Sequence, residues 1–283
     1  MSSTVADRGI PPLRDAHESS RLGVYLREVW QRRNYVHHVA LNELKRRQVT
    51  NVLGNLWHLL NPTLSVAVYY LIFGVLLETD RGVENFLLFL TVGLFLYQAT
   101  QSSTIDGAKS VVTNKGLIKA VRFPRVLLPL TSTWTEFLSG LSNYAVLFAT
   151  ALLTGQAPRW SWLAIVPIVL LLFVFDAGLA MIAARLSTHF VDTIQILPFV
   201  FRLVFYASGV IFSVDAYVDS DAGLLRLLFV LNPMYCFITM GRWAMMGVDC
   251  SPVLVLSAAV WSITALVVGF FFFRAGEEGY ARD

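Results

Sequence analysis

The chain has 283 residues, of which 56% are hydrophobic and only 14% charged, with a formal net charge of +3. A soluble domain of this length usually carries about 45–50% apolar and about 25% charged residues. The excess of apolar residues excludes a single aqueous domain and predicts an integral membrane protein. Two cysteines, Cys236 and Cys250, are too few for a disulfide framework or a metal cluster. They form either one external bridge or two unrelated thiols.

The first 50 residues are polar and hold nine of the 22 Lys and Arg residues. Residues 1–20 mix Gly, Pro, Ser and charges of both signs, so we expect a flexible cytoplasmic tail and no signal peptide. In residues 21–53, apolar side chains recur every three or four positions among bases. This pattern predicts an amphipathic helix in the lipid headgroup layer. A solvated basic helix packed on a partner is the alternative.

Six apolar segments follow, and each approaches the roughly 20 residues that a helix needs to cross about 30 Å of hydrocarbon. They are Leu56–Leu77, Phe86–Thr104, Val126–Thr154, Leu163–Leu186, Thr193–Phe212 and Pro252–Phe273. With the amino terminus inside, cytoplasmic segments hold 17 Lys and Arg residues and external segments hold four. Because cytoplasmic loops are enriched in these residues, both termini are expected inside. Residues 54–283 are therefore predicted to form an all-α membrane domain with six transmembrane helices.

The connection between the second and third apolar segments is basic and half apolar. The stretch Ser110–Pro129 contains Lys115, Lys119 and Arg122 and ends in a Phe-Pro-Arg corner. A helix of this kind at the cytoplasmic rim of a membrane protein is placed to receive force from a soluble partner. We interpret the stretch as a coupling element.

The region between the fifth and sixth segments contains two apolar runs that are too short to cross. Leu224–Val230 and Met234–Met246 are separated by Asn232-Pro233, and Arg242 interrupts the second run. Such runs are typical of re-entrant or interfacial helices, whose backbone at membrane depth must be buried or line a water-filled path. We therefore expect an external gate, with a simple external cap as the alternative.

Three ionisable residues lie deep within the predicted spans: Glu136, Asp176 and Arg202. Charges at that depth cost at least roughly 2.5–3.5 kcal/mol each, so they are expected to face the bundle interior and find partners. Arg202 is predicted either to pair with Glu136 or Asp176 or to line a conduit.

Several short motifs occur in the order found in one family of membrane proteins, and together they cover about residues 45–283. They are Gly54-Asn55-Leu56-Trp57, Asn61-Pro62, Asn114-Lys115-Gly116-Leu117-Ile118, Phe123-Pro124-Arg125, Asn232-Pro233-Met234, Gly241-Arg242 and Arg274-Ala275-Gly276-Glu277. On these residues the chain resembles the membrane subunit of type-2 ABC exporters for cell-surface polysaccharides. It departs from the family at Ser208-Gly209-Val210-Ile211, where we expect proline in place of Gly209.

The resemblance implies a homodimer in the bacterial inner membrane, docked on two copies of a separate ATPase that binds ATP and Mg. The substrate would be a lipid-linked polysaccharide, exported through a channel; no nucleic acid is expected. The chain lacks the G-x-x-x-x-G-K-[ST] phosphate loop, so we expect no catalytic residues, metal or cofactor of its own. In related exporters the amino-terminal helix and the loop after the second span contact the ATPase. By position, the candidates in that loop are Asn114, Lys115, Lys119, Arg122 and Phe123.

A polysaccharide conduit should offer aromatic faces for sugar rings and neutral hydrogen-bonding groups. The candidates in the first, second and fifth segments are Tyr69, Tyr70, Phe73, Phe95, Tyr97, Gln98, Gln101, Phe199, Arg202 and Tyr206. Arg46 and Arg47 are candidates for holding the diphosphate of the lipid carrier. The external gate would use Asn232, Pro233 and Arg242. The alternative role of the aromatic residues is packing between helices. The alternative role of the basic residues is contact with anionic lipid.

Two other classes of protein remain as alternatives. A secondary transporter would be expected to show internal repeats with interrupted spans in matching halves, and no convincing repeat is present. An integral membrane enzyme acting on glycan lipids would need clustered acids or histidines at one interface. Asp215, Asp219 and Asp221 do cluster, but among Ser, Ala and Gly, which is typical of a solvated loop.

Overall fold

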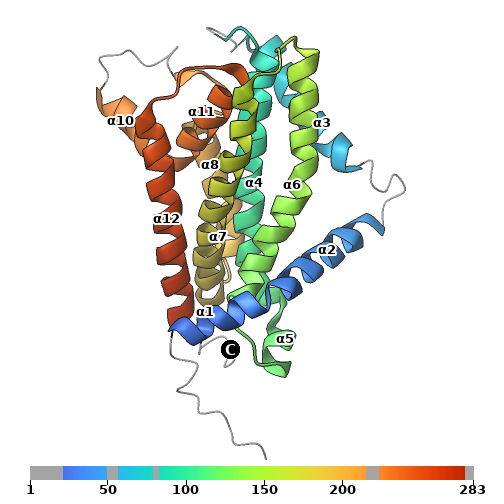
Figure 1. Ribbon diagram of the computed structural model, residues 1–283, viewed down its shortest axis with the longest axis vertical. Coiled ribbons are helices and arrows are strands. Elements are labelled where there is room, and N and C mark those ends of the chain that lie inside the picture. Colours follow the sequence, from blue (N-terminus) through green and yellow to red (C-terminus); the bar gives the residue numbers. More distant parts are fainter. Residues whose placement is uncertain (1–21, 50–56, 79–82, 215–222, 278–283) are drawn as a thin grey trace, which may run out of the picture.

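The computed structural model describes residues 22–49, 57–78, 83–214 and 223–277, and within these ranges all regular secondary structure is helical. Long helices run side by side, and short helices gather at the two ends of the bundle (Figure 1). The predicted all-α architecture is confirmed. The expected acidic cluster at Asp215–Asp221 and the tail over residues 1–20 lie outside the described residues.

Five helical segments in the described ranges are long and apolar enough to cross a membrane. They are α3 (Trp57–Tyr69) with a π-helical continuation (Tyr70–Leu76), α4 (Phe86–Thr113), α6 (Leu127–Leu153), a 3-10 turn (Trp160–Ala164) with α7 (Ile165–His189), and α12 (Pro252–Ala275). The fifth predicted segment forms only α8 (Thr193–Ala207), whose 15 residues are shorter than a span. The sixth crossing therefore stays a prediction.

The short helices form two groups, one at each end of the bundle. At one end lie α1 (Leu22–Gln31), α2 (Arg33–Val49) and α5 (Lys115–Ala120), and at the other lie α10 (Gly223–Leu231) and α11 (Pro233–Met246) (Figure 1). The stretch predicted as one helix over residues 21–53 forms two helices in its described part, because the chain turns at Arg32, and its place in the headgroup layer stays a prediction. The Arg33 side chain donates to the Trp30 carbonyl at 3.2 Å, which satisfies the end of α1. The two short apolar runs after the fifth segment form helices α10 and α11, while their predicted re-entrant or interfacial position stays a prediction.

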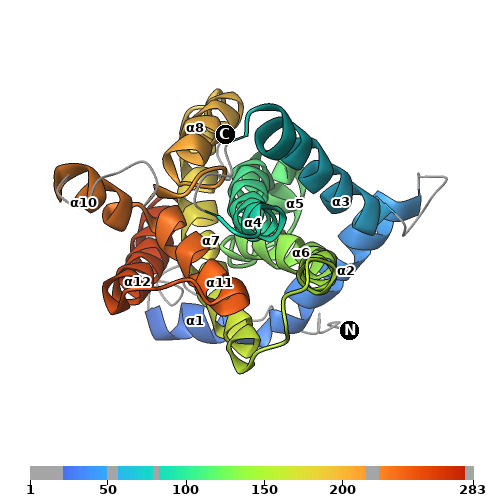
Figure 2. The ribbon, with the colours of Figure 1, turned by 90° about the horizontal axis from the view of Figure 1, so that it is seen from above.

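Helix α4 forms the axis of the bundle. Viewed from above, α3, α6, α7, α8 and α11 surround it (Figure 2). Eighteen of its 28 residues are buried, which accounts for its nearly continuous apolar sequence from Phe86 to Tyr97.

Helices α7 and α12 approach each other through glycine. A Cβ atom on Gly178 would lie 2.2 Å from the carbonyl carbon of Ala265, and one on Gly269 would lie 2.3 Å from the Gly178 carbonyl oxygen. Neither distance is possible for a side chain, so the two backbones touch because these residues have none. Close packing through small residues is how transmembrane helices associate without a hydrophobic driving force between them.

The chain leaves helical geometry after Ala207, although the apolar run continues to Phe212. Gly209 takes a φ of +62°, in the left-handed region that glycine alone adopts readily. Proline, which we expected at this position, fixes φ near −65° and cannot adopt that conformation. The predicted helical segment Thr193–Phe212 therefore ends early, and Ser208–Ile211 forms buried irregular backbone.

Candidate functional site

The irregular backbone after α8 is held by two of the predicted gate residues. Asn232 caps α11 by accepting from the Met234 N–H at 3.0 Å, and its amide donates to the Ala207 carbonyl at 3.0 Å. Pro233 is the first residue of α11, where a missing N–H costs nothing. The Asn-Pro pair thus starts one helix and fastens the end of another.

Arg242 completes this connection from inside the bundle. Its side chain is 4% exposed, donates to the carbonyls of Phe89 at 3.3 Å and Val210 at 2.9 Å, and lies 3.2 Å from the centre of the Phe89 ring. It therefore braces the irregular segment against α4. Cys236 and Cys250 are free thiols in this structure, and the bridge that the sequence left open is not formed.

The basic stretch after α4 is a short helix on an anchored loop. Helix α4 ends where the Asn114 side chain donates to the Ser110 carbonyl at 2.8 Å, and α5 follows with six residues. Ile118 is 5% exposed and packs into an apolar cluster with Tyr25 of α1. The other predicted coupling residues are Lys115, Lys119 and Arg122, which are exposed, and Phe123, which is half-buried. The stretch thus exposes three cationic side chains, while Ile118 anchors it to the apolar cluster.

The carboxylate of Glu277 joins three segments at this end. Glu277 belongs to one of the family motifs, but the sequence predicted no role for it. The Oε1 atom of Glu277, just after α12, accepts from the Tyr25 hydroxyl at 3.1 Å and from the Arg125 N–H at 2.7 Å. The Arg125 guanidinium also donates to the Glu277 carbonyl. The Arg274 guanidinium lies 5.2 Å from the centre of the Tyr25 ring. These contacts therefore connect the start of α6, the end of α12 and helix α1.

Glu277 gives a pH-dependent prediction. Burial raises its pKa above the usual value, against the opposing effect of the bonds from Arg125 and Tyr25. Because the folded chain then holds this proton more tightly than the unfolded chain, stability contributed at this site falls as pH rises through the raised pKa. Glu277→Gln keeps an acceptor oxygen and should remove this part of the pH dependence of the melting temperature.

The matched variant is Glu277→Ala, which leaves both donors without an acceptor and is expected to cost about 1–3 kcal/mol, most at pH values below the raised pKa. Thermal unfolding of the purified full chain across a pH series measures both effects. Parallel pH profiles for the wild type and Glu277→Gln would contradict the prediction.

Arg47, at the end of α2, connects this helix to two of the candidate spans. Its Nη1 lies 2.7 Å from Glu136 Oε1 on α6, and its Nη2 lies 3.0 Å from Asp106 Oδ2 on α4. Its Nε also lies 3.6 Å from Glu43 Oε1. We call Arg47, Asp106 and Glu136 the α2 clasp. Further along, the Trp134 indole of α6 donates to His37 of α2 at 3.1 Å, so α2 is fixed along α6 at two points.

The predicted pairing of Arg202 with Glu136 or Asp176 is wrong within the part of the chain that the structure describes. Glu136 binds Arg47 instead, whereas Arg202 is exposed on α8 with its guanidinium 5.7 Å from the centre of the Phe199 ring. Asp176 is 5% exposed on α7 and faces the interior as expected. Its Oδ1 has no hydrogen-bond partner among the described residues, and it lines a cavity of about 20 Å³ with Ser103 and Glu136.

The predicted conduit residues fall into three groups. Phe95 and Tyr97 are 1% and 2% exposed, and the Tyr97 hydroxyl donates to the Phe201 carbonyl, so both belong to the packed core. Gln98 and Gln101 are half-buried on α4. The remaining residues lie on α3, its π-helical continuation and α8, which are neighbours on one side of α4 (Figure 2). They are Tyr69, Tyr70, Phe73, Phe199, Arg202 and Tyr206.

We call the group on α3, its π-helical continuation and α8 the aromatic face. Phe199, Arg202 and Tyr206 follow one another at three- and four-residue spacing, so they share one exposed side of α8. Phe199 is 64% exposed and Tyr206 51%. Tyr69 stacks on Phe73 with ring centres 6.1 Å apart. The face combines large exposed rings with one cation and no acid among its members.

A family model for ABC-2 type transporters matches residues 37–246, which include α4, α6, α7, α11 and most of α2. The chain belongs to the ABC-2 transporter family. The match confirms the family resemblance read from the short motifs and, with the five apolar helices, makes this ABC-2 protein a multi-pass membrane protein.

Individual relatives of this ABC-2 protein extend the comparison. The chain is 29% identical over 261 residues to the O-antigen export system permease protein RfbA of Myxococcus xanthus, covering 91% of this chain and 98% of that protein. It is 31% identical over 178 residues to a protein of the same name from Klebsiella pneumoniae, covering 62% and 68% of the two chains. The polysialic acid transport protein KpsM of Escherichia coli is 21% identical over 240 residues, or 84% of this chain and 92% of KpsM.

Proposed function

We propose that this ABC-2 protein is the membrane-spanning subunit of an ATP-driven exporter that moves a lipid-linked polysaccharide out of the cytoplasm. The observation that carries the proposal is its similarity to an O-antigen export permease over 98% of that protein's length. In this proposal a separate ATPase binds ATP and Mg, and two copies of it dock on a homodimer of this chain in the inner membrane. Both termini face the cytoplasm.

The arrangement of the ends supports a docking surface for the ATPase. Helices α1, α2 and α5 gather at one end (Figure 1). Lys115 and Lys119 are exposed on α5, and the exposed Arg122 follows that helix. Motion received there passes by two routes. Glu277 connects α1 to α6 and α12, and the α2 clasp connects α2 to α4 and α6.

The aromatic face supports a conduit between two copies of the chain. Exposed rings such as Phe199 and Tyr206 offer apolar surfaces on which sugar rings stack, while a face without acids does not hold a moving polymer through fixed carboxylates. Arg202 is the one member that carries charge. With its three carboxylate neighbours, Arg47 is a poor candidate for a carrier diphosphate, so Arg46, whose side chain is 80% exposed, is the better one.

Charge reversal on α5 tests the docking surface. The triple variant Lys115→Glu, Lys119→Glu and Arg122→Glu is expected to abolish co-purification with the ATPase and surface delivery of polysaccharide. The control is the triple variant Lys115→Arg, Lys119→Arg and Arg122→Lys. It keeps all three charges and should keep both co-purification with the ATPase and delivery of polysaccharide.

The outcome also separates the alternatives. ATP hydrolysis stimulated in the pair but absent in the single chain would dismiss a secondary transporter and a membrane enzyme. Undiminished docking and export by the triple Glu variant would refute the role of α5. A chain that binds no ATPase at all would refute the proposed function.

A further inference from the structure

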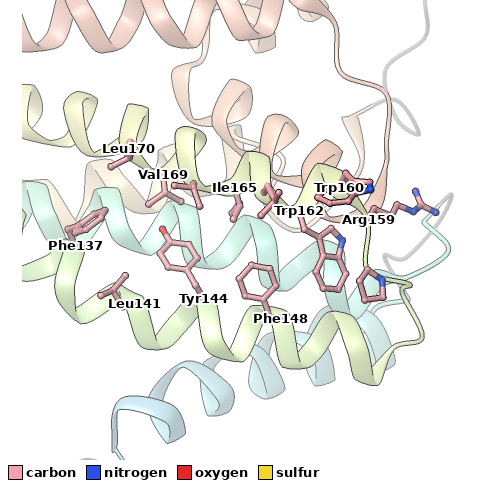
Figure 3. A pocket seen from close by; sticks show the side chains of 13 residues that line it. Phe137, Leu141, Tyr144, Phe148, Arg159, Trp160, Trp162, Ile165, Val169 and Leu170 are labelled. Atoms are coloured by element: carbon pink, nitrogen blue, oxygen red, sulfur yellow. The ribbon is translucent and has the colours of Figure 1, made fainter.

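A groove of about 630 Å³ runs between α6 and α7 (Figure 3). Leu141, Leu163 and Val166 along it are 53%, 64% and 56% exposed, so the groove opens to the surroundings of the bundle. Because α6 and α7 are both candidate spans, those surroundings are the hydrocarbon of the bilayer. The deeper walls are formed mainly by rings and branched side chains: Phe137, Tyr144, Phe148, Trp162, Ile165 and Val169.

The length of the groove matches one leaflet. Along α6 it extends from Phe137 to Phe148, a rise of about 16 Å at about 1.5 Å per residue. Half of the hydrocarbon core is about 15 Å thick. The groove therefore begins at the end of α6 that is farthest from α5 and finishes near the middle of the membrane.

The groove has an apolar body and one cationic end. Of its 13 lining residues none is acidic, and Arg159 is the one cation among them. Arg159 is exposed at the mouth, and the one side-chain hydrogen bond described for it runs from Nη1 to the Met246 carbonyl at 3.5 Å. Since a guanidinium has five N–H donors, most of its capacity is available to a ligand. Trp160 beside it is 88% exposed, as is typical of rings at headgroup level.

We propose that this groove binds the acyl tail of one anionic phospholipid, whose phosphate is held by Arg159. Arginine pairs with phosphate through two parallel N–H hydrogen bonds. The aromatic side chains that line the groove below Arg159 would contact the acyl tail in place of neighbouring lipids. The site lies on the far side of the bundle from the aromatic face and does not depend on the proposed function.

The dimensions favour a lipid tail over a helix from a second copy. Spread over about 16 Å, a volume of about 630 Å³ gives a cross-section of about 40 Å². An α-helix with its side chains is about 10–12 Å across and needs roughly twice that area. A flexible hydrocarbon tail fits.

The first test fills the groove. Leu141→Trp places a large ring inside it, while Leu256→Trp places the same ring on α12, at a position 65% exposed and outside the groove. The full chain is purified in mild detergent, and retained phospholipid is counted by native mass spectrometry. Occupancy should fall at least about tenfold for Leu141→Trp, since displacing two methylene groups already costs about that factor, and should not change for Leu256→Trp. If Leu141→Trp fails to assemble, Leu141→Phe replaces it.

The second test addresses the headgroup. In nanodiscs of phosphatidylglycerol and phosphatidylcholine, Arg159→Gln should lower the preference for the anionic lipid about fivefold, whereas Arg159→Lys should keep most of it. Equal lipid retention by the two Trp variants, or an unchanged preference in Arg159→Gln, would overturn the proposal. So would cysteine cross-linking of Val166→Cys between two copies of a lipid-free chain, because a second copy would then cover the groove.

Discussion

Replacing Gly178 by alanine is expected to separate α7 from α12 and to lower the melting temperature of the purified chain. The added Cβ atom would lie 2.2 Å from the Ala265 carbonyl carbon, which is backbone and has no rotamer to change. Overpacking of this kind typically costs about 1–3 kcal/mol, and a backbone contact belongs at the upper end. Gly178→Leu should abolish assembly.

Gly140→Ala is the matched control. Gly140 also lies inside a long helix, α6, but a Cβ atom there would meet nothing within 4 Å. Alanine is the better helix former by up to about 1 kcal/mol, so this variant should melt at the same or a higher temperature. Similar melting temperatures for the two alanine variants would show that the crossing of α7 and α12 is looser than described.

Replacing Arg47 by alanine is expected to uncouple ATP hydrolysis from export while the chain still assembles. Removal of the guanidinium leaves Asp106 and Glu136 without their shared partner, which costs about 1–3 kcal/mol at this half-exposed position, and frees α2 from α4 and α6. Surface polysaccharide should therefore be lost even though the ATPase still co-purifies. Export and hydrolysis by the same reconstituted complex measure the coupling.

A lysine on the same helix provides the control. Lys45→Ala removes an equal charge from an exposed side chain of α2 that lies outside the α2 clasp. It should retain coupling. Adding Asp106→Asn and Glu136→Gln to Arg47→Ala removes the stranded charges and should restore stability without restoring export. Full export by Arg47→Ala alone would eliminate the α2 clasp as a transmission route.

The long helices were predictable because each contains an apolar run of the length that a membrane-spanning helix needs. Helices α6, α7 and α12 begin and end close to the predicted boundaries. Helix α4 continues to Thr113 rather than Thr104, because its last turns are amphipathic and pack through Val111 against the α1 cluster. Hydropathy alone could not locate the end of α8, since the residues after Ala207 are as apolar as those before it. The break depends on a backbone angle at Gly209, which hydropathy does not register.

The site was less predictable because its contacts join distant parts of the sequence. Glu136 was recognised as a deep charge in need of a partner, but Arg47 is 89 residues away on a helix predicted to lie in the headgroup layer. Only the path of α2 along α6 brings them together. Likewise, Glu277 binds a residue 252 positions earlier, and its sequence neighbourhood offers no signal for that contact.

The irregular segment after α8 has a consequence for biosynthesis. The 15 residues of α8 rise about 22 Å, so part of a hydrocarbon layer about 30 Å thick would have to be crossed by backbone without helical bonds. Lipid offers no donors to the carbonyls of Ala207 and Val210; Asn232 and Arg242 do. At about 5–20 residues per second, the ribosome delivers Arg242 a few seconds after Val210. If the fifth segment crosses the membrane as predicted, we therefore expect it to be released into the bilayer only after α11 has been translated, so that a later part of the chain completes the crossing.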